Sequence, residues 1–428
     1  MPAILYNQRP RTKLISVRLS KPIVRISIVA MLATHAFFLW SVRGGIRRAD
    51  PDFTVFYTAA RTLRAGLGSQ LYEPGTQRAV QLEFASNSDI RHGALPYIHP
   101  PFEALLFVPF TFLRYSTAFL LWNLLNLFLL IVLAVVLRDW VECLRQVPAW
   151  EIVATCLAFF PILANFHQGQ DAILLLLLVV LCGRAIDRQA DFIAGCWLGM
   201  GVFKYHLILP LAFILIVWKG RRLLVGFAAV GSALAAISVG IVGWHEALRY
   251  PVYVQRVILQ PGLGAIPPRQ LPNLLGLFAG WPLTEGSGRT VEAAVAICSI
   301  GVVAAIAWLR GIRQDSRLLR LGIASAVIAA LLVGYSTNTY DLSLLIVPLA
   351  LVADYCERES PDRPLLKNRL TLPALPLLIS PLWFFLWMRW ERIHLIAIFL
   401  LWWLFAIRRE IVRAAAFGHG PREILRSA

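Results

Sequence analysis

Long stretches without a single charged residue recur along the chain, and they constrain its fold more than any other feature. Eight of them span residues 26–42, 115–137, 152–170, 223–244, 293–309, 321–340, 370–388 and 393–407. Several match the ~20 apolar residues that an α-helix needs to cross a bilayer. With 58% hydrophobic and 15% charged residues, the composition excludes a water-soluble globular domain and a disordered chain. The sequence therefore predicts an all-α polytopic membrane protein.

These runs predict a bundle of about 11–13 transmembrane helices. The expected spans are about 23–42, 115–137, 150–167, 172–187, 192–204, 205–218, 223–244, 291–309, 320–337, 341–355, 370–388 and 393–407. If the N-terminus is cytoplasmic, the inner loops hold 26 of the 41 Lys and Arg residues, in agreement with the positive-inside rule. Both termini, 1–22 and 408–428, are therefore expected in the cytoplasm. Arg43 to Arg48 stand where a signal peptide would have its cleavage site, so we expect an uncleaved first helix.

A rival topology makes 97–113 a full span and fuses 192–218 into one helix. It leaves 23 Lys and Arg residues inside, so the charge count favours the first topology. A glycine cluster, Gly195–Gly201, lies just before Lys204 and suits a broken helix of the kind that lines a cavity. Both topologies place both termini in the cytoplasm.

Two outer loops, 43–114 and 245–290, carry most of the remaining polar residues. Neither loop has the length or the strand pattern of a soluble domain, so residues 1–428 are expected to form one membrane domain. In the first loop, 52–66 is amphipathic and is expected to lie on the membrane surface. The apolar stretch 104–113 is too short to span the bilayer.

The net charge of +17 does not indicate nucleic-acid binding. The basic residues form short patches between apolar runs, which is typical of cytoplasmic loops, and no basic stripe lies in a polar domain. The six cysteines are scattered, mostly inside apolar runs, and none forms a CxxC motif. They predict neither a disulfide framework nor a metal site.

Asp50-Pro51-Asp52 opens the amphipathic segment and has two interpretations. In the first, Asp50 is the N-cap, Pro51 takes the first helical position, and Asp52 interacts with the helix dipole. In the second, Asp52 projects toward a cavity at the membrane boundary and acts as a general base. The local sequence does not decide between them.

Three more polar segments interrupt apolar runs on the outer side, and each has a structural and a functional interpretation. Asn165–Asp171 is either a hairpin turn facing water or a wall of a substrate cavity. Lys204 either extends to the interface or, with His206, provides the counter-charge for a lipid phosphate. Tyr335–Asp341 joins two spans, and Asp341 is a candidate helix cap.

The order and spacing of several motifs resemble a known family. They are Asp52-Phe-x3-Tyr57-x-Ala-Ala60, Gly66-x4-Leu71-Tyr72, Tyr97-x2-Pro100-Pro101-Phe, Gln168-Gly-Gln170, Ala194-Gly195 to Lys204, and Tyr340-Asp341-Leu-x2-Leu-Leu. Between about residues 50 and 350, the chain resembles glycosyltransferase family 87, the polyprenyl-phosphate-mannose type of transferase. The resemblance implies the C-type membrane glycosyltransferase fold.

The resemblance also implies an activity, an inverting transfer of one sugar on the outer face of the plasma membrane. Mannose, another hexose or a pentose would pass from a polyprenyl-phosphate donor to a lipid-linked or glycan acceptor. Asp52 corresponds to the family's catalytic base. Family members often have His where this chain has Tyr340, so His206 and His99 are the candidates to replace that imidazole. The expected substrate-binding residues are Tyr57, His99, Gln168, Gln170, Lys204, His206, Arg256, Asn273, Tyr340 and Asp341.

We expect no obligatory metal and no other cofactor, because a leaving monophosphate carries less charge than a nucleotide diphosphate. Lys204, as an isolated cation, is expected to bind the donor phosphate, so that Lys204→Ala weakens donor binding and leaves the fold intact. The expected partners are the donor, a glycolipid or glycan acceptor and membrane lipids, but no nucleic acid. The alternatives are a lipid or glycan transporter (a flippase) and an inactive scaffold. Polar motifs on one face of the membrane, without an inverted repeat, favour the transferase.

Overall fold

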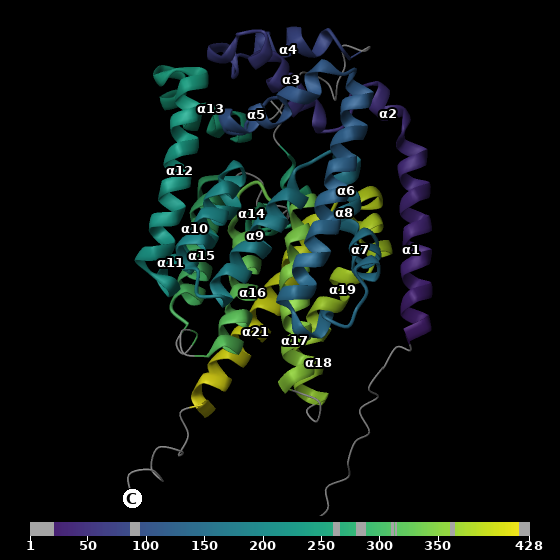
Figure 1. Cartoon of the computed structure of the whole chain (residues 1–428), viewed down its shortest axis with the longest axis vertical. Helices are drawn as coiled ribbons and strands as arrows, with labels where there is room; N and C mark the ends of the chain where they lie inside the picture. Colours follow the sequence, from purple (N-terminus) through teal and green to yellow (C-terminus); the bar gives the residue numbers. More distant parts are fainter. Residues whose placement is uncertain are drawn as a thin grey trace, which may run out of the picture.

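A computed structural model describes residues 21–85, 95–259, 266–279, 288–309, 312, 315–359 and 364–418. Within these residues every regular element is helical, which confirms the predicted all-α class. Figure 1 shows long helices running side by side and a cap of helices across one end of them. The cap contains α2 (Gly44–Arg47), α3 (Phe53–Arg64), α4 (Pro74–Leu82), α5 (Pro101–Phe107) and α13 (Trp244–Leu259).

The bundle below the cap contains the longest helices of the chain. Its helices are α1 (Lys21–Val42), α6 (Tyr115–Trp140), α7 (Ala149–Leu157), α8 (Phe160–Gln168), α9 (Ala172–Asp187), α10 (Asp191–Met200), α11 (Tyr205–Lys219), α12 (Arg221–Val242), α14 (Leu274–Ala279), α15 (Gly288–Ala307), α16 (Ser316–Val333), α17 (Ile346–Glu359), α18 (Pro364–Thr371), α19 (Leu375–Leu378), α20 (Ser380–Phe384) and α21 (Ile396–Gly418). Helix α1 begins, and α21 ends, at the end of the bundle opposite the cap (Figure 1).

By length and hydropathy, six of the described helical stretches can cross a membrane, or eight if each of two bent helix pairs forms one span. This confirms a polytopic membrane protein. Three further bundle helices do not meet the same criteria. Helices α9 and α17 have 16 and 14 residues, and the second half of α21 carries Arg408, Arg409 and Glu410. The predicted count of 11–13 transmembrane helices therefore stays a prediction.

The segment Asp191–Lys219 is one apolar stretch of 29 residues by hydropathy, but the chain reverses direction inside it. The ammonium of Lys219 lies 3.2 Å from a carboxylate oxygen of Asp191. A straight helix of this length would hold these two ends ~43 Å apart. The reversal occurs at the 3₁₀ turn η5 (Gly201–Lys204), so the predicted break at Lys204 is confirmed and the fused helix of the rival topology is wrong.

The glycines before the break have a packing function. A Cβ atom on Gly195 would lie 2.1 Å from the carbonyl oxygen of Leu223, and one on Gly226 would lie 2.1 Å from that of Phe192. Helices α10 and α12 therefore pack backbone to backbone, and only glycine allows that approach. This packing fixes α10 against the bundle and determines where its C-terminal end, with Lys204, is placed.

Two predictions concern the cap, and one of them is wrong. The stretch 97–113 forms α5 and a 3₁₀ turn, Val108–Phe112, which is too short to span, as expected. Helix α3, however, does not lie on the membrane surface, because nine of its twelve residues are buried. It packs against α4, α5 and Val108–Phe112. The buried threonine hydroxyls of α3 form hydrogen bonds within the helix. Thr58 and Thr62, for example, donate to backbone carbonyls one turn earlier.

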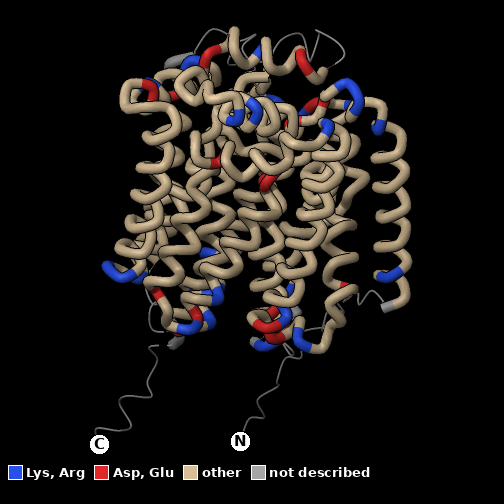
Figure 2. Tube along the Cα trace, turned by 45° about the horizontal axis from the view of Figure 1, so that its top comes forward, with Lys and Arg blue, Asp and Glu red and all other residues tan. Residues whose placement is uncertain are grey.

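The buried apolar side chains form two clusters. The larger fills the bundle, and the smaller surrounds α3 and α5 and includes Phe53, Phe56, Phe107 and Trp122. Figure 2 shows that Lys, Arg, Asp and Glu residues gather at the two ends of the molecule, with few between them. The division of the chain into one membrane domain stays a prediction.

The reversal at η5 predicts the outcome of a cross-linking experiment. In a background without the six native cysteines, Asp191→Cys with Lys219→Cys should be joined by a short bis-maleimide, because the two side chains meet. Met200→Cys with Lys219→Cys is the control, since Met200 ends α10 next to the η5 turn and Lys219 ends α11 at the far end of the hairpin. Cross-linking of the control pair but not of the 191/219 pair would contradict the hairpin.

Candidate functional site

A cavity of about 390 Å³ lies under the cap. Seven of the eleven predicted site residues line it, namely Asp52, His99, Gln170, Lys204, His206, Tyr340 and Asp341. They come from the start of α3, the segment before α5, the α8–α9 turn, η5 with the start of α11, and the 3₁₀ turn η8 (Tyr340–Leu345). The fold therefore brings most of the separate sequence motifs together in one place.

Asp52 is held in the cavity by two glutamines of the α8–α9 turn. The Gln170 amide donates to a carboxylate oxygen of Asp52 at 2.9 Å, and the Asp52 backbone N–H donates to the Gln168 side-chain oxygen at 3.0 Å. Gly169 between them has φ +62°, and a Cβ there would lie 2.8 Å from Phe53 and Phe119. A glycine is therefore needed to bring both glutamines to the start of α3.

The capping role predicted for Asp50 is wrong. Helix α3 begins at Phe53, its N-cap residue is Asp52, and the Asp52 side chain makes no capping hydrogen bond. Asp50 instead pairs with Arg48 at 2.8 Å and lies outside the cavity. The Asp52 side chain thus lies on the cavity side of the helix start, which favours the second interpretation of this motif.

Lys204 is buried, with 2% of its surface exposed, and it is not the isolated cation that the sequence predicts. Its ammonium lies 3.1 Å from Asp171 and 3.0 Å from Asp341, and it donates to the Gln170 side-chain oxygen at 3.4 Å. The Tyr340 ring centre is 4.8 Å away. The buried ammonium is thus ion-paired with two carboxylates and hydrogen-bonded to Gln170.

The polar segment Asn165–Asp171 does not face water. Asn165, Gln170 and Asp171 are all buried, and the Asn165 oxygen accepts from the Ala172 backbone N–H at 3.0 Å. The turn therefore faces the protein interior and contributes Gln170 to the cavity. The prediction of a solvated hairpin turn is wrong because the cap covers this end of the bundle.

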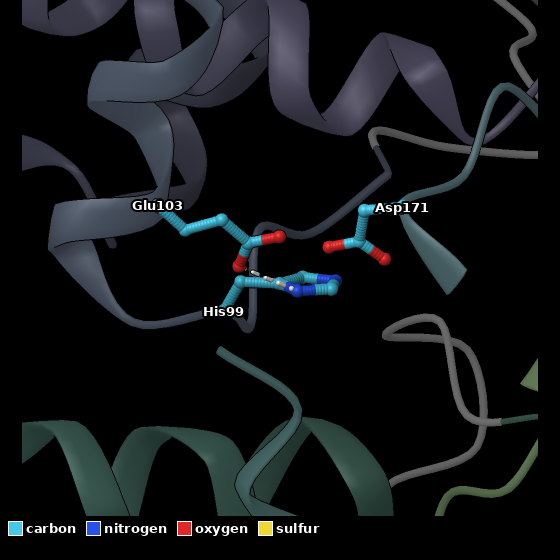
Figure 3. A group of neighbouring side chains, drawn as sticks. All are labelled: His99, Glu103 and Asp171. Carbon is cyan, nitrogen blue, oxygen red and sulfur yellow. Dashed lines mark ion pairs between the residues drawn. The ribbon is translucent and has the colours of Figure 1, made fainter. Parts of the chain in front are cut away.

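One functional candidate, Glu103, was missed by the sequence analysis. It lies four residues after His99 on α5, and its carboxylate oxygen is 2.9 Å from His99 Nδ1. Figure 3 shows the carboxyl groups of Glu103 and Asp171 facing each other beside the His99 ring. Burial lowers the pKa of His99 to about 4 and, together with the charge of Asp171, raises the pKa of Glu103 well above its usual value. The sequence signal that could have revealed it is a glutamate four residues after His99 in an otherwise apolar segment.

His99, Glu103 and Asp171 are also the described residues that could hold a metal ion. Each offers one ligand atom, and these atoms lie within 4.8 Å of one another. An imidazole with two carboxylates suits several divalent cations. Asp171 is already paired with Lys204 in this structure. The expectation of a metal-independent enzyme stays a prediction.

Four predicted site residues lie outside the cavity. The Tyr57 hydroxyl donates to the Leu113 carbonyl at 2.7 Å, and the Asn273 amide donates to the Gly334 carbonyl at 2.6 Å. Arg256 is exposed on α13, and the Gln168 side-chain oxygen accepts from the backbone N–H of Asp52. Tyr57 and Asn273 thus stabilise the fold, whereas Gln168 positions Asp52. Their roles in substrate binding remain untested predictions.

Two tyrosines outside the predicted set add to the cavity wall. Tyr205 and Tyr335 both line it, and their hydroxyls are joined by a hydrogen bond of 2.6 Å. The cavity thus combines a carboxylate, buried charges and aromatic surfaces, and this combination can hold a polar ring and remove a proton from one of its hydroxyls.

Comparison with known proteins agrees with the chemistry of this cavity. The sequence model of glycosyltransferase family 87 matches residues 97–334, which is more than half of the chain. A polyprenol-phosphate-mannose-dependent α-(1-2)-phosphatidylinositol mannoside mannosyltransferase of Mycobacterium tuberculosis (strain H37Rv) is 29% identical over 256 residues. That similarity covers 56% of this chain and 57% of the relative, so the chain spans little more than half of the relative's length. No solved structure matches the chain.

The two ion pairs of Lys204 change what its removal should do. Lys204→Ala leaves Asp171 and Asp341 buried without their cation, and breaking a buried pair in this way typically costs about 3–5 kcal/mol. We therefore expect a strongly lowered Tm for the purified variant in detergent. Arg249→Ala, which breaks an exposed pair with Glu246, should cost less than about 1 kcal/mol. Equal Tm values for the two variants would show that Lys204 is not structural.

Proposed function

Because this chain belongs to glycosyltransferase family 87, we propose that it moves one sugar from a polyprenyl-phosphate donor to a lipid-linked or glycan acceptor. It is a membrane glycosyltransferase by its family and its apolar helices. The observation that carries the finer proposal is the Asp52 carboxylate, which two glutamines orient into a cavity lined by the family's motifs. The name of the mycobacterial relative supports a polyprenol-phosphate-mannose donor and a glycolipid acceptor.

In the proposed reaction Asp52 is the general base. Its carboxylate takes the proton from an acceptor hydroxyl, whose oxygen then forms a bond to the anomeric carbon of the donor sugar. The bond from that carbon to the phosphate oxygen breaks on the opposite face, and its electron pair leaves with the polyprenyl phosphate. A single displacement of this kind inverts the anomeric configuration. The hydrogen bond from Gln170 aims the carboxylate at the hydroxyl.

The leaving phosphate requires a positive or hydrogen-bonding environment. Lys204 acts on it through its charge, because its buried ammonium is already ion-paired with Asp171 and Asp341. We assign the direct contact to His206, which lines the cavity and has a buried Nε2 without a hydrogen-bond partner. This assignment modifies the expectation that Lys204 binds the phosphate itself.

The assay that tests the function uses purified protein, native lipid extract and a panel of radiolabelled polyprenyl-phosphate sugars. We expect transfer from one of them, with polyprenyl-phosphate mannose as the first candidate. Asp52→Asn should lower the rate by about 10²–10⁴, because it keeps the shape and removes the proton acceptor. Asp50→Asn is the matched control and should retain most activity, since Asp50 pairs with Arg48 outside the cavity. An active Asp52→Asn variant would exclude this base.

The proposal places the cap and its cavity on the outer face of the plasma membrane. In a background without native cysteines, Gln70→Cys in the exposed part of the cap should react with an impermeant thiol reagent in intact cells. Ser316→Cys, exposed at the opposite end of the bundle, should react only after the membrane is opened. The reverse labelling pattern would place the cavity on the cytoplasmic side and exclude an outer-face reaction.

A further inference from the structure

Buried carboxylates outnumber the cations around Lys204. Glu103, Asp171 and Asp341 are 3%, 1% and 0% exposed. In the described part of the chain, Lys204 is the one Lys or Arg that forms an ion pair with any of them. Three carboxylates therefore share one positive charge. Burying charge without a compensating partner is costly, so this group of side chains calls for a further positive partner.

Glu103 shows where such a partner would bind. Within the described residues, both of its carboxylate oxygens are buried and make no hydrogen bond, and the same holds for both oxygens of Asp171. Figure 3 shows the two carboxyl groups turned toward each other beside the His99 ring. Two buried carboxylates repel each other in this arrangement unless a positive group lies between them.

The side chains around this point have the chemistry and the spacing of metal ligands. His99, Glu103 and Asp171 each offer one atom, and these atoms lie within 4.8 Å of one another. Around a tetrahedral cation with bonds of about 2.1 Å, ligand atoms lie about 3.4 Å apart, so small side-chain rotations bring all three onto one ion. An imidazole among the ligands favours first-row transition metals and Zn²⁺ over Mg²⁺ and Ca²⁺. We propose that His99, Glu103 and Asp171 bind one divalent cation such as Zn²⁺.

The cation and Lys204 bind to Asp171 without competing. Asp171 contacts Lys204 through Oδ1 at 3.1 Å, so its Oδ2 is the oxygen that faces the cation. Two added positive charges, together with that of Lys204, balance Glu103, Asp171 and Asp341. The cation therefore completes the ion-pair network of Lys204.

The cation joins two segments of the cavity wall. His99 and Glu103 lie at the start of α5, and Asp171 lies in the α8–α9 turn, next to the Gln170 that donates to Asp52. Its role is to hold this wall in place, and it takes no part in the proposed displacement. The site modifies the expectation of a protein that works without metal.

The first test measures Zn²⁺ binding by the full-length, tag-free protein in detergent. The protein is stripped with EDTA, freed of chelator and titrated with radioactive Zn²⁺ in excess Mg²⁺. We expect one saturable site per chain. Glu103→Gln keeps the side-chain size and removes a charged ligand. It should weaken binding by at least about tenfold, because even residues that only orient metal ligands contribute about 10–100-fold.

Glu83→Gln is the matched control, since it changes an exposed glutamate paired with Arg61 and should bind Zn²⁺ as the wild type does. Equal affinity of the wild type and Glu103→Gln would mean an adventitious ion only and would overturn the proposal. Absence of saturable binding to the wild type would overturn it as well.

The second test separates a cation site from a glutamate that only supports the fold. In EDTA, Glu103→Gln should melt at a Tm at least as high as that of the wild type, because it removes one of two facing carboxylates. Added Zn²⁺ should raise the Tm of the wild type alone, since a ligand of the folded state stabilises it. A Zn²⁺ effect that is equal in both proteins, or absent from both, contradicts the site. Neither test uses a substrate, so failure of the proposed transferase function would leave both results unchanged.

Discussion

The ion pairs of Lys204 with Asp171 and Asp341 are the interaction on which the rest of the site depends. They join three parts of the chain that are far apart in sequence, the η5 turn, the α8–α9 turn and η8. A buried ammonium is stable only if its charge and its donors are matched, so these three segments cannot move independently. The glycines that pack α10 against α12 place Lys204 where this match is possible.

The same lysine also orients the Asp52 carboxylate without touching it. Gln170 transmits the constraint, because its oxygen faces Lys204 and its NH₂ group therefore faces the carboxylate. Asp52 stands at the N-cap position of α3 but makes no capping hydrogen bond, so the helix start loses a typical stabilisation of ~1 kcal/mol. Such a missing local stabilisation, here a helix cap, is typical of functional sites, where the placement of a side chain matters more than its contribution to stability.

Sequence reasoning predicted the bundle and most of the cavity, because long uncharged runs and clustered polar motifs are local signals. Comparing the Lys and Arg counts of the two topologies also favoured a helix break at Lys204, which the structure has. Sequence reasoning missed the partners of Lys204, because no local pattern pairs a lysine with Asp171 and Asp341. It missed Glu103, which alone is an ordinary acidic residue in the first turn of a helix. Burial of α3 depends on α4 and α5 packing around it, which amphipathicity alone does not reveal.

The charges around the cavity bear on how a phosphate leaves it. Asp52 and Asp341 line the cavity, Asp171 lies behind Lys204, and Lys204 is the one Lys or Arg among the described lining residues. In the proposed reaction the donor's phosphodiester carries one negative charge, whereas the departing phosphate monoester carries more and meets an excess of carboxylates. For a polyprenyl-phosphate donor, this excess opposes tight binding of the product, and the lysine limits the cost in the transition state. Under the proposed function, this charge balance favours release of the lipid phosphate over its retention.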